Sequence, residues 1–142
     1  MALSNDPVFP QTPKTAGVEL LTATSTSDED VSSTTNRLQL MAAGADGALV
    51  TSLKYFGDTT SVNITAQSVN LWLQPGGTGD MYLLDSKVQV AYTAATTTAQ
   101  TPVVFVDKSD PDNAIRLAAS DKLFISHSVD LIGHASCEYI DY

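Results

Sequence analysis

The chain has 142 residues, of which 43% are hydrophobic and 16% charged, and its net charge is −9. This length suits one domain with a real core. Its seven Lys and Arg residues never cluster, which argues against binding to nucleic acid or to anionic membranes, since phosphate contacts need cations that displace counterions. The single cysteine, Cys137, excludes an internal disulfide.

The first sixteen residues predict an extended arm. Three prolines recur there at intervals of three residues, with two apolar residues between them. Proline fixes φ and lacks a backbone N–H, which disfavours helices and central strands. A stiffened segment loses less entropy when it docks, so we interpret 1–16 as a partner-binding arm; an idle tail is the alternative. The predicted contacts are Pro7, Val8, Phe9, Pro10 and Pro13.

Beyond the arm, short apolar segments alternate with polar turns, and a polar, Thr-rich loop covers 24–36. No segment has a convincing helical pattern. Period-two alternation with a turn about every ten residues predicts an all-β protein with a single, jelly-roll-like β-sandwich over 17–142. The predicted strands are 17–23, 37–43, 48–56, 61–66, 69–74, 81–93, 102–107, 114–119, 122–128 and 134–140.

The same alternation predicts the core. Trp72 has the opposite parity from Leu71 and Leu73, which places it on an outer face. The side chains that we expect to be mostly buried are Val62, Ile64, Leu71, Leu73, Val88, Val90, Val104, Val106, Leu123 and Ile125.

Two histidines and the cysteine are the first candidates for chemistry. His127 and His134 flank a predicted hairpin turn, and Cys137 follows. Structural zinc usually requires four ligands with closely paired cysteines, which are missing. His134 and Cys137 are three residues apart on a predicted strand, so they should point to opposite faces. There is also no GxSxG motif. We therefore expect no metal, no cofactor and no enzymatic activity.

Two further sets of residues suggest other binding sites, one for a cation and one for a sugar. The turn with Asp107, Asp110, Asp112 and Asn113 is rich in oxygen ligands but lacks EF-hand spacing, so we interpret it as an ordinary turn around Pro111. A second set of side chains offers an aromatic platform for a sugar, although aromatic residues of a sandwich more often pack in its interior. That set is Trp72, Tyr82 and Tyr92.

Several segments together resemble the small all-β head-decoration proteins of tailed bacteriophages. The segments are "MALSNDPVFPQTPK" at 1–14, "GADGALVTSL" at 44–53, "LAASDKLFISHS" at 117–128 and the final Asp141–Tyr142 pair. Here Tyr139 and Ile140 replace the glycines usual before that pair.

The resemblance implies a virion structural role as a decoration or cement protein on the capsid exterior. Its expected partners are the major capsid protein and further copies of itself, with a trimer favoured. We expect synthesis in the host cytoplasm, because no leader or membrane span of about 20 apolar residues is evident. The alternatives are a tail or head–tail connector subunit and a carbohydrate- or receptor-binding module.

Overall fold

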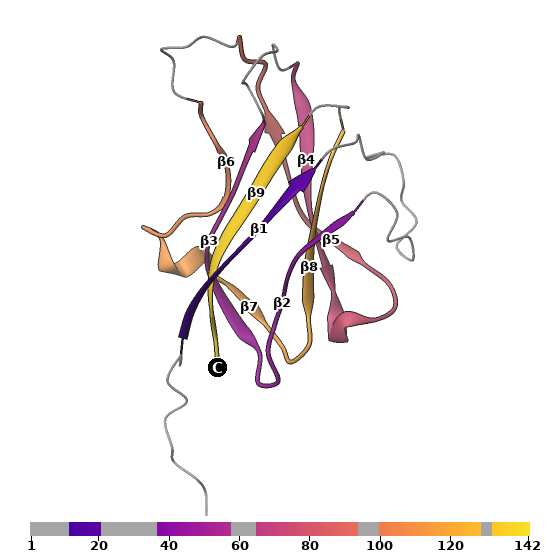
Figure 1. Ribbon diagram of the computed structural model, residues 1–142, viewed down its shortest axis with the longest axis vertical. Helices are drawn as coiled ribbons and strands as arrows, with labels where there is room; N and C mark the ends of the chain where they lie inside the picture. The colour runs from indigo at the N-terminus through magenta and orange to yellow at the C-terminus, as the bar shows by residue number, and fades with distance from the viewer. Residues whose placement is uncertain (1–11, 21–36, 58–64, 94–99, 129–131) are drawn as a thin grey trace, which may run out of the picture.

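A computed structural model of the protein describes residues 12–20, 37–57, 65–93, 100–128 and 132–142. The regular elements in these ranges are strands and two single-turn 3-10 helices (Figure 1). None of them contains a helix long and apolar enough to cross a membrane. The elements are β1 (Thr12–Leu20), β2 (Leu38–Ala42), β3 (Ala48–Gly57), β4 (Gln67–Gln74), η1 (Pro75–Gly77), β5 (Tyr82–Gln89), β6 (Val103–Val106), η2 (Pro111–Asn113), β7 (Ile115–Leu117), β8 (Lys122–His127) and β9 (Gly133–Asp141).

Two antiparallel sheets face each other. One has the strand order β1-β9-β3-β6, with β7 also paired to β3, and the other has the order β2-β8-β4-β5. The pairing is nested: β1 with β9, β2 with β8, β3 with β6, and β4 with β5. Nested pairing across two sheets defines a jelly roll, so the predicted all-β, jelly-roll-like sandwich is confirmed. The sandwich has two open sides, where edge strands of the two sheets lie next to each other: β1 beside β2 on one side, and β5 beside β6 on the other.

The sandwich begins five residues earlier than expected. All of β1 pairs with β9, from Thr12 opposite Asp141 to Leu20 opposite Gly133. Residues 12–16, which we predicted to be arm, therefore belong to the sheet, and the boundary at 16/17 is wrong. β1 tolerates Pro13 because it is an edge strand, which leaves one side of the backbone unpaired. Pro7, Val8, Phe9 and Pro10 lie outside the described residues.

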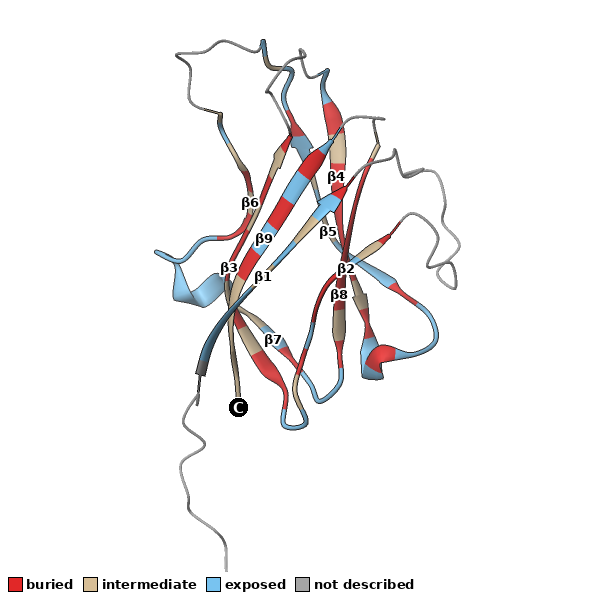
Figure 2. Cartoon of the chain, viewed as in Figure 1, coloured by how far each residue is buried: buried red, intermediate tan, exposed pale blue. Residues whose placement is uncertain are grey.

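Most of the predicted core that lies in the described residues is confirmed, with two exceptions. Leu71, Val106, Leu123 and Ile125 are buried, and Leu73 and Val104 are partly buried. Figure 2 shows the alternation of buried and exposed residues along β9. Val62 and Ile64 lie outside the described residues. Val88 and Val90 were wrongly placed in the core: their side chains are 67% and 69% exposed.

A buried polar cluster lies between the two sheets. The Tyr55 hydroxyl and His127 Nδ1 share a hydrogen bond of 2.6 Å, and neither residue is exposed. Gln67 Nε2 donates to the Tyr55 hydroxyl at 3.2 Å and to Gln89 Oε1 at 2.6 Å. Buried polar groups that bond one another fix a unique arrangement of the elements that carry them, here β3, β4, β5 and β8.

Candidate protein interfaces

Strand β5 presents a row of apolar side chains to solvent. It forms one edge of its sheet, since β4 is its only partner among the described strands. Of the large apolar side chains that are exposed in the described ranges, only Ile132 lies away from β5 and the residue after it. An exposed apolar edge strand is a surface for pairing with another chain. The exposed side chains are Tyr82, Leu83, Leu84, Val88 and Val90.

The buried polar cluster explains why β5 faces this way. Gln89 is opposite Gln67 in the β4–β5 register and bonds to it inside the sandwich. Side chains alternate along a strand, so turning Gln89 inward turns Val88 and Val90 outward. We had expected the reverse because valines normally occupy the inner face.

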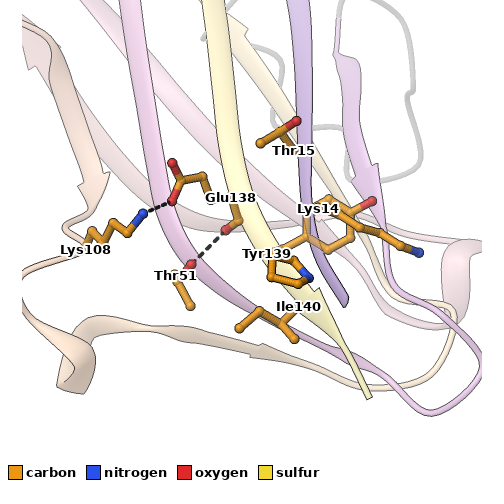
Figure 3. A pocket seen from close by; sticks show the side chains of 8 residues that line it. Lys14, Thr15, Thr51, Lys108, Glu138, Tyr139 and Ile140 are labelled. Atoms are coloured by element: carbon orange, nitrogen blue, oxygen red, sulfur yellow. Dashed lines mark hydrogen bonds and ion pairs between the residues drawn. The ribbon is translucent and has the colours of Figure 1, made fainter. Parts of the chain in front are cut away.

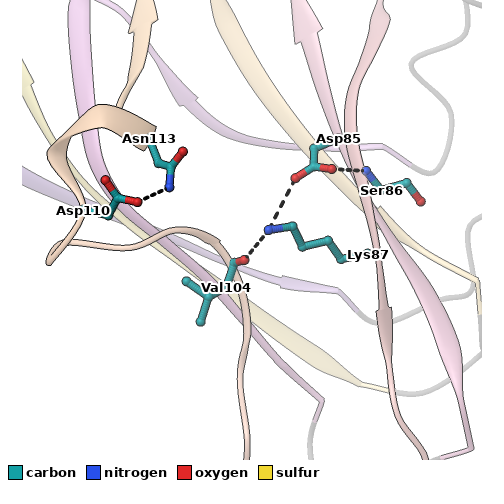
Figure 4. A network of polar contacts seen from close by, with 6 residues as sticks. All are labelled: Asp85, Ser86, Lys87, Val104, Asp110 and Asn113. Atoms are coloured by element: carbon teal, nitrogen blue, oxygen red, sulfur yellow. Dashed lines mark hydrogen bonds and ion pairs between the residues drawn. The ribbon is translucent and has the colours of Figure 1, made fainter.

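The middle of β5 is polar and has a regular register. Beyond a bulge at Leu84, Asp85, Ser86 and Lys87 lie opposite Leu71, Asn70 and Val69 of β4. Lys87 Nζ donates to the Val104 carbonyl at 2.7 Å and lies 3.6 Å from the Asp85 carboxylate (Figure 4). Lys87 thereby bridges the open side between β5 and β6.

A small hollow continues the apolar surface towards β6. Its volume is about 280 Å³. Val88 and Val90 line it from one side, and Pro102 and Val103 line it from the other. The hollow therefore extends the apolar surface at the Val88 and Val90 end of β5, beyond its polar middle.

A second candidate surface lies near the start of β1, and we call it the arm-root groove. It has a volume of about 600 Å³ and lies over β1, β9 and β3 (Figure 3). Its apolar lining comes from Pro13, Tyr139 and Ile140. Pro13, which we predicted to contact a partner, therefore lies in a groove wall as well as in a strand.

Both lysines of the arm-root groove have carboxylate partners. Lys14 forms an ion pair with Asp141, and the hydrogen bond and charge of that carboxylate raise the pKa of Lys14. Lys108 Nζ lies 2.6 Å from the Glu138 carboxylate. With its charges paired internally, the groove favours apolar contacts over a charged ligand.

The structure separates the residues proposed for zinc or thiol chemistry. His127 is completely buried and faces the other sheet, whereas His134 is exposed on β9. Cys137 is buried, so the predicted opposite orientation of His134 and Cys137 is confirmed. Burial raises the pKa of the Cys137 thiol to about 11, which opposes formation of a nucleophilic thiolate.

The Cys137 pKa predicts a stability loss in alkali. The thiol has an ordinary pKa of 9.0 and a folded pKa of about 11, so its protonated form is favoured by folding. Its contribution is complete below pH 9 and is lost as pH rises through 11. At pH 10 we expect a loss of about 1 kcal/mol in the free energy of unfolding. Between pH 8 and pH 10, urea unfolding should show a smaller decline in the free energy of unfolding for Cys137→Ala than for the wild type. Equal declines in the two proteins would contradict the prediction. Burial also raises the pKa of Tyr55 to about 12. Because Tyr55 is present in the wild type and in Cys137→Ala, it contributes to the decline in both proteins.

The acidic turn folds on itself. The Asp107 carboxylate accepts from the backbone and hydroxyl of Ser109 at 2.9 Å, and Asp110 accepts from Asp112 and Asn113 around η2. Figure 4 includes the Asp110–Asn113 bond. These are ordinary turn contacts, and within the described ranges no three His, Cys, Asp or Glu side chains gather to hold a metal.

The proposed aromatic platform does not assemble. Trp72 lies on the outer face as predicted, but it is only 6% exposed because the Arg37 guanidinium lies 3.8 Å above its ring. Trp72 Nε1 donates to Ser126 Oγ at 2.9 Å. Tyr82 is opposite Leu73 and so has the other parity. The two rings cannot form one surface for a sugar.

The β5 surface was not among the predicted sites. Three consecutive apolar residues, Tyr82 to Leu84, break the period-two pattern, and such a run is unusual on a half-buried strand. That interruption was the available signal.

No family model matches the chain, and no curated protein matches it. Among solved structures, it is similar to "Structure of Eiger TNF from S. frugiperda", at 13% identity and a TM-score of 0.42, over 73% of this chain and 64% of that one. It is also similar to "Structure of infectious bursal disease virus Gx strain", at 12% identity and a TM-score of 0.35, over 99% of this chain and 37% of that one. The chain thus spans less than two thirds of either structure, and the jelly-roll assignment rests on the strand pairing alone.

Proposed function

We propose that this chain is a virion structural protein, without enzymatic activity, that binds the outer surface of a tailed-phage head and stabilises it. The major capsid protein is its partner. The observation that carries the proposal is the pairing of Thr12–Ala16 with β9. In the sequence, Phe9 precedes the first residue of β1 by only three residues, so we expect the arm to contact its partner close to the arm-root groove.

The charge of the chain supports an exterior position. A net charge of −9 is repelled by packed DNA and suits a surface that faces water. Because Lys14 and Lys108 are paired with carboxylates, attachment depends on apolar contact by the arm. Several arms on one homo-oligomer would add avidity.

The test is co-sedimentation of the purified protein with empty heads. Burying one Phe supplies roughly 1.5–3 kcal/mol, so Phe9→Ala should weaken attachment about tenfold or more. Deletion of 1–11 should abolish it. The melting temperature of the free protein should stay unchanged, and Leu3→Ala is the matched control. Full occupancy by the deletion variant would overturn the proposal.

The two alternatives are outcomes of the same experiment. Sedimentation with purified tails or connectors, but not with heads, would identify a tail or connector subunit. Retention on a glycan surface without binding to either particle would identify a carbohydrate- or receptor-binding module.

A further inference from the structure

We propose that β5 binds the β5 strand of a second copy of this chain, antiparallel, with the two Ser86 residues opposite each other. The two four-stranded sheets would then form one continuous sheet across a twofold axis. This inference concerns the free protein and does not rest on attachment to heads.

The faces of β5 limit the possible registers. Asp85 and Lys87 share the inner face with Leu71 and Val69, while Ser86 and Val88 share the outer face with Asn70 and Ser68. Residues that lie opposite each other in an antiparallel pair point to the same face of the sheet. A twofold axis perpendicular to the sheet must therefore pass midway between the two copies of one residue. Between residues 85 and 88, the axis can lie at any of the four positions.

Charge separates these four registers. An axis at Asp85 opposes two carboxylates, and an axis at Lys87 opposes two ammonium groups; both arrangements are unfavourable. An axis at Ser86 instead places Asp85 opposite the partner's Lys87 and Lys87 opposite the partner's Asp85. With an axis at Val88, neither Asp85 nor Lys87 lies opposite a residue of the other charge. Ser86 is therefore the favoured centre.

Exposed apolar side chains flank the charged pair on both sides. With the axis at Ser86, Leu83 and the bulge residue Leu84 approach the partner's Val88. All three side chains are exposed. Mutual burial of apolar side chains drives such pairing, and the cross-strand charges select the register.

In the free chain, the carboxylate of Asp85 occupies a backbone N–H group that a partner strand would need. The Ser86 backbone N–H donates to the carboxylate of Asp85 at 2.8 Å (Figure 4). Both Asp85 and Lys87 have side chains that are about 40% exposed, so they can reorient. On pairing, the carboxylate moves to the partner's Lys87, and the Ser86 amide is released for the strand ladder.

Pairing at β5 leaves the arm-root grooves accessible. β1, which contributes to the lining of the groove, lies on the side of the sandwich with β2, whereas β5 lies on the opposite side with β6. A β5-paired dimer therefore presents one arm-root groove at each of its two far sides.

The test is light scattering on the full chain over a concentration series, without capsids. We expect a species of about 30 kDa, twice the 15.0 kDa of one chain. Asp85→Lys alone and Lys87→Asp alone should each raise the dissociation constant about tenfold or more, because each variant opposes like charges. Mixing the two variants should restore a heterodimer, since one supplies two cations and the other two carboxylates. Circular dichroism of each variant checks that it folds.

Cross-linking checks the register. Residues that form a hydrogen-bonded antiparallel pair have Cα atoms about 5.5 Å apart, within disulfide range. Ser86→Cys should therefore form a disulfide-linked dimer on oxidation, whereas Val90→Cys should not. A monomer at all concentrations, a trimer, failure of the mixture to dimerise, or a dimer cross-linked through Val90→Cys alone would each overturn the proposal. Loss of capsid binding with the dimer intact would overturn only the proposed function.

Discussion

Replacing Gly133 with alanine should lower the free energy of unfolding by about 3 kcal/mol, which is at the upper end of the range for overpacking a core. A Cβ atom at this position would lie 2.1 Å from the Tyr55 hydroxyl oxygen and 2.6 Å from the adjoining ring carbon. The ring cannot retreat easily, because hydrogen bonds to His127 and Gln67 hold the hydroxyl in place. Urea unfolding monitored by circular dichroism measures the change.

Two variants make this result specific to the contact with Tyr55. Gly17→Ala is the matched control in the neighbouring strand, since its Cβ would lie 3.4 Å from the Ala135 carbonyl, and it should cost less than about 1 kcal/mol. In a Tyr55→Leu background, Gly133→Ala should cost much less than in the wild type, because the clashing atoms are gone. Equal costs in the two backgrounds would show that Tyr55 is not responsible.

Alternation predicted the fold class well because most strands keep one face buried. It failed in β5, where Gln89 occupies the inner face, and in β3, where the ladder contains an extra residue. In β3, strict alternation from Leu53 and Tyr55 would place Leu49 inside as well, but a bulge between Val50 and Ser52 changes the parity. Val50 is therefore the fully buried residue, and Leu49 is only partly buried. No glycine marks this bulge, so the local sequence gives no signature of it.

The candidate surfaces were less predictable than the fold. Prolines indicated the arm, but the pairing of 12–16 with β9 joins segments about 125 residues apart, and edge position cannot be derived from local sequence. For β5, the identity of the inner face depends on a contact between Gln89 and Gln67 on another strand. Where sequence reasoning fails in this way, a functional surface is a reasonable expectation.

That glutamine pair provides the last prediction. Gln67→Leu and Gln89→Leu should each lower the free energy of unfolding by about 2 kcal/mol, because each leaves the other amide buried without its partner. The double variant should cost much less than the sum, since removing both polar groups removes the desolvation penalty as well. It also removes Gln67 Oε1, a buried atom with no hydrogen-bond partner in the described part of the chain. Tyr55 keeps its bond to His127 throughout.

A double-mutant cycle by urea unfolding measures this coupling. We expect a favourable interaction of about 2 kcal/mol or more between the two glutamines. Additive costs would mean that the pair does not hold the inner face of β5. If the coupling is present, the double variant should still dimerise, because Leu at position 89 also faces inward and Val88 and Val90 stay exposed. The inward orientation of residue 89 would then connect packing inside the sandwich with the exposure of Val88 and Val90 at its edge.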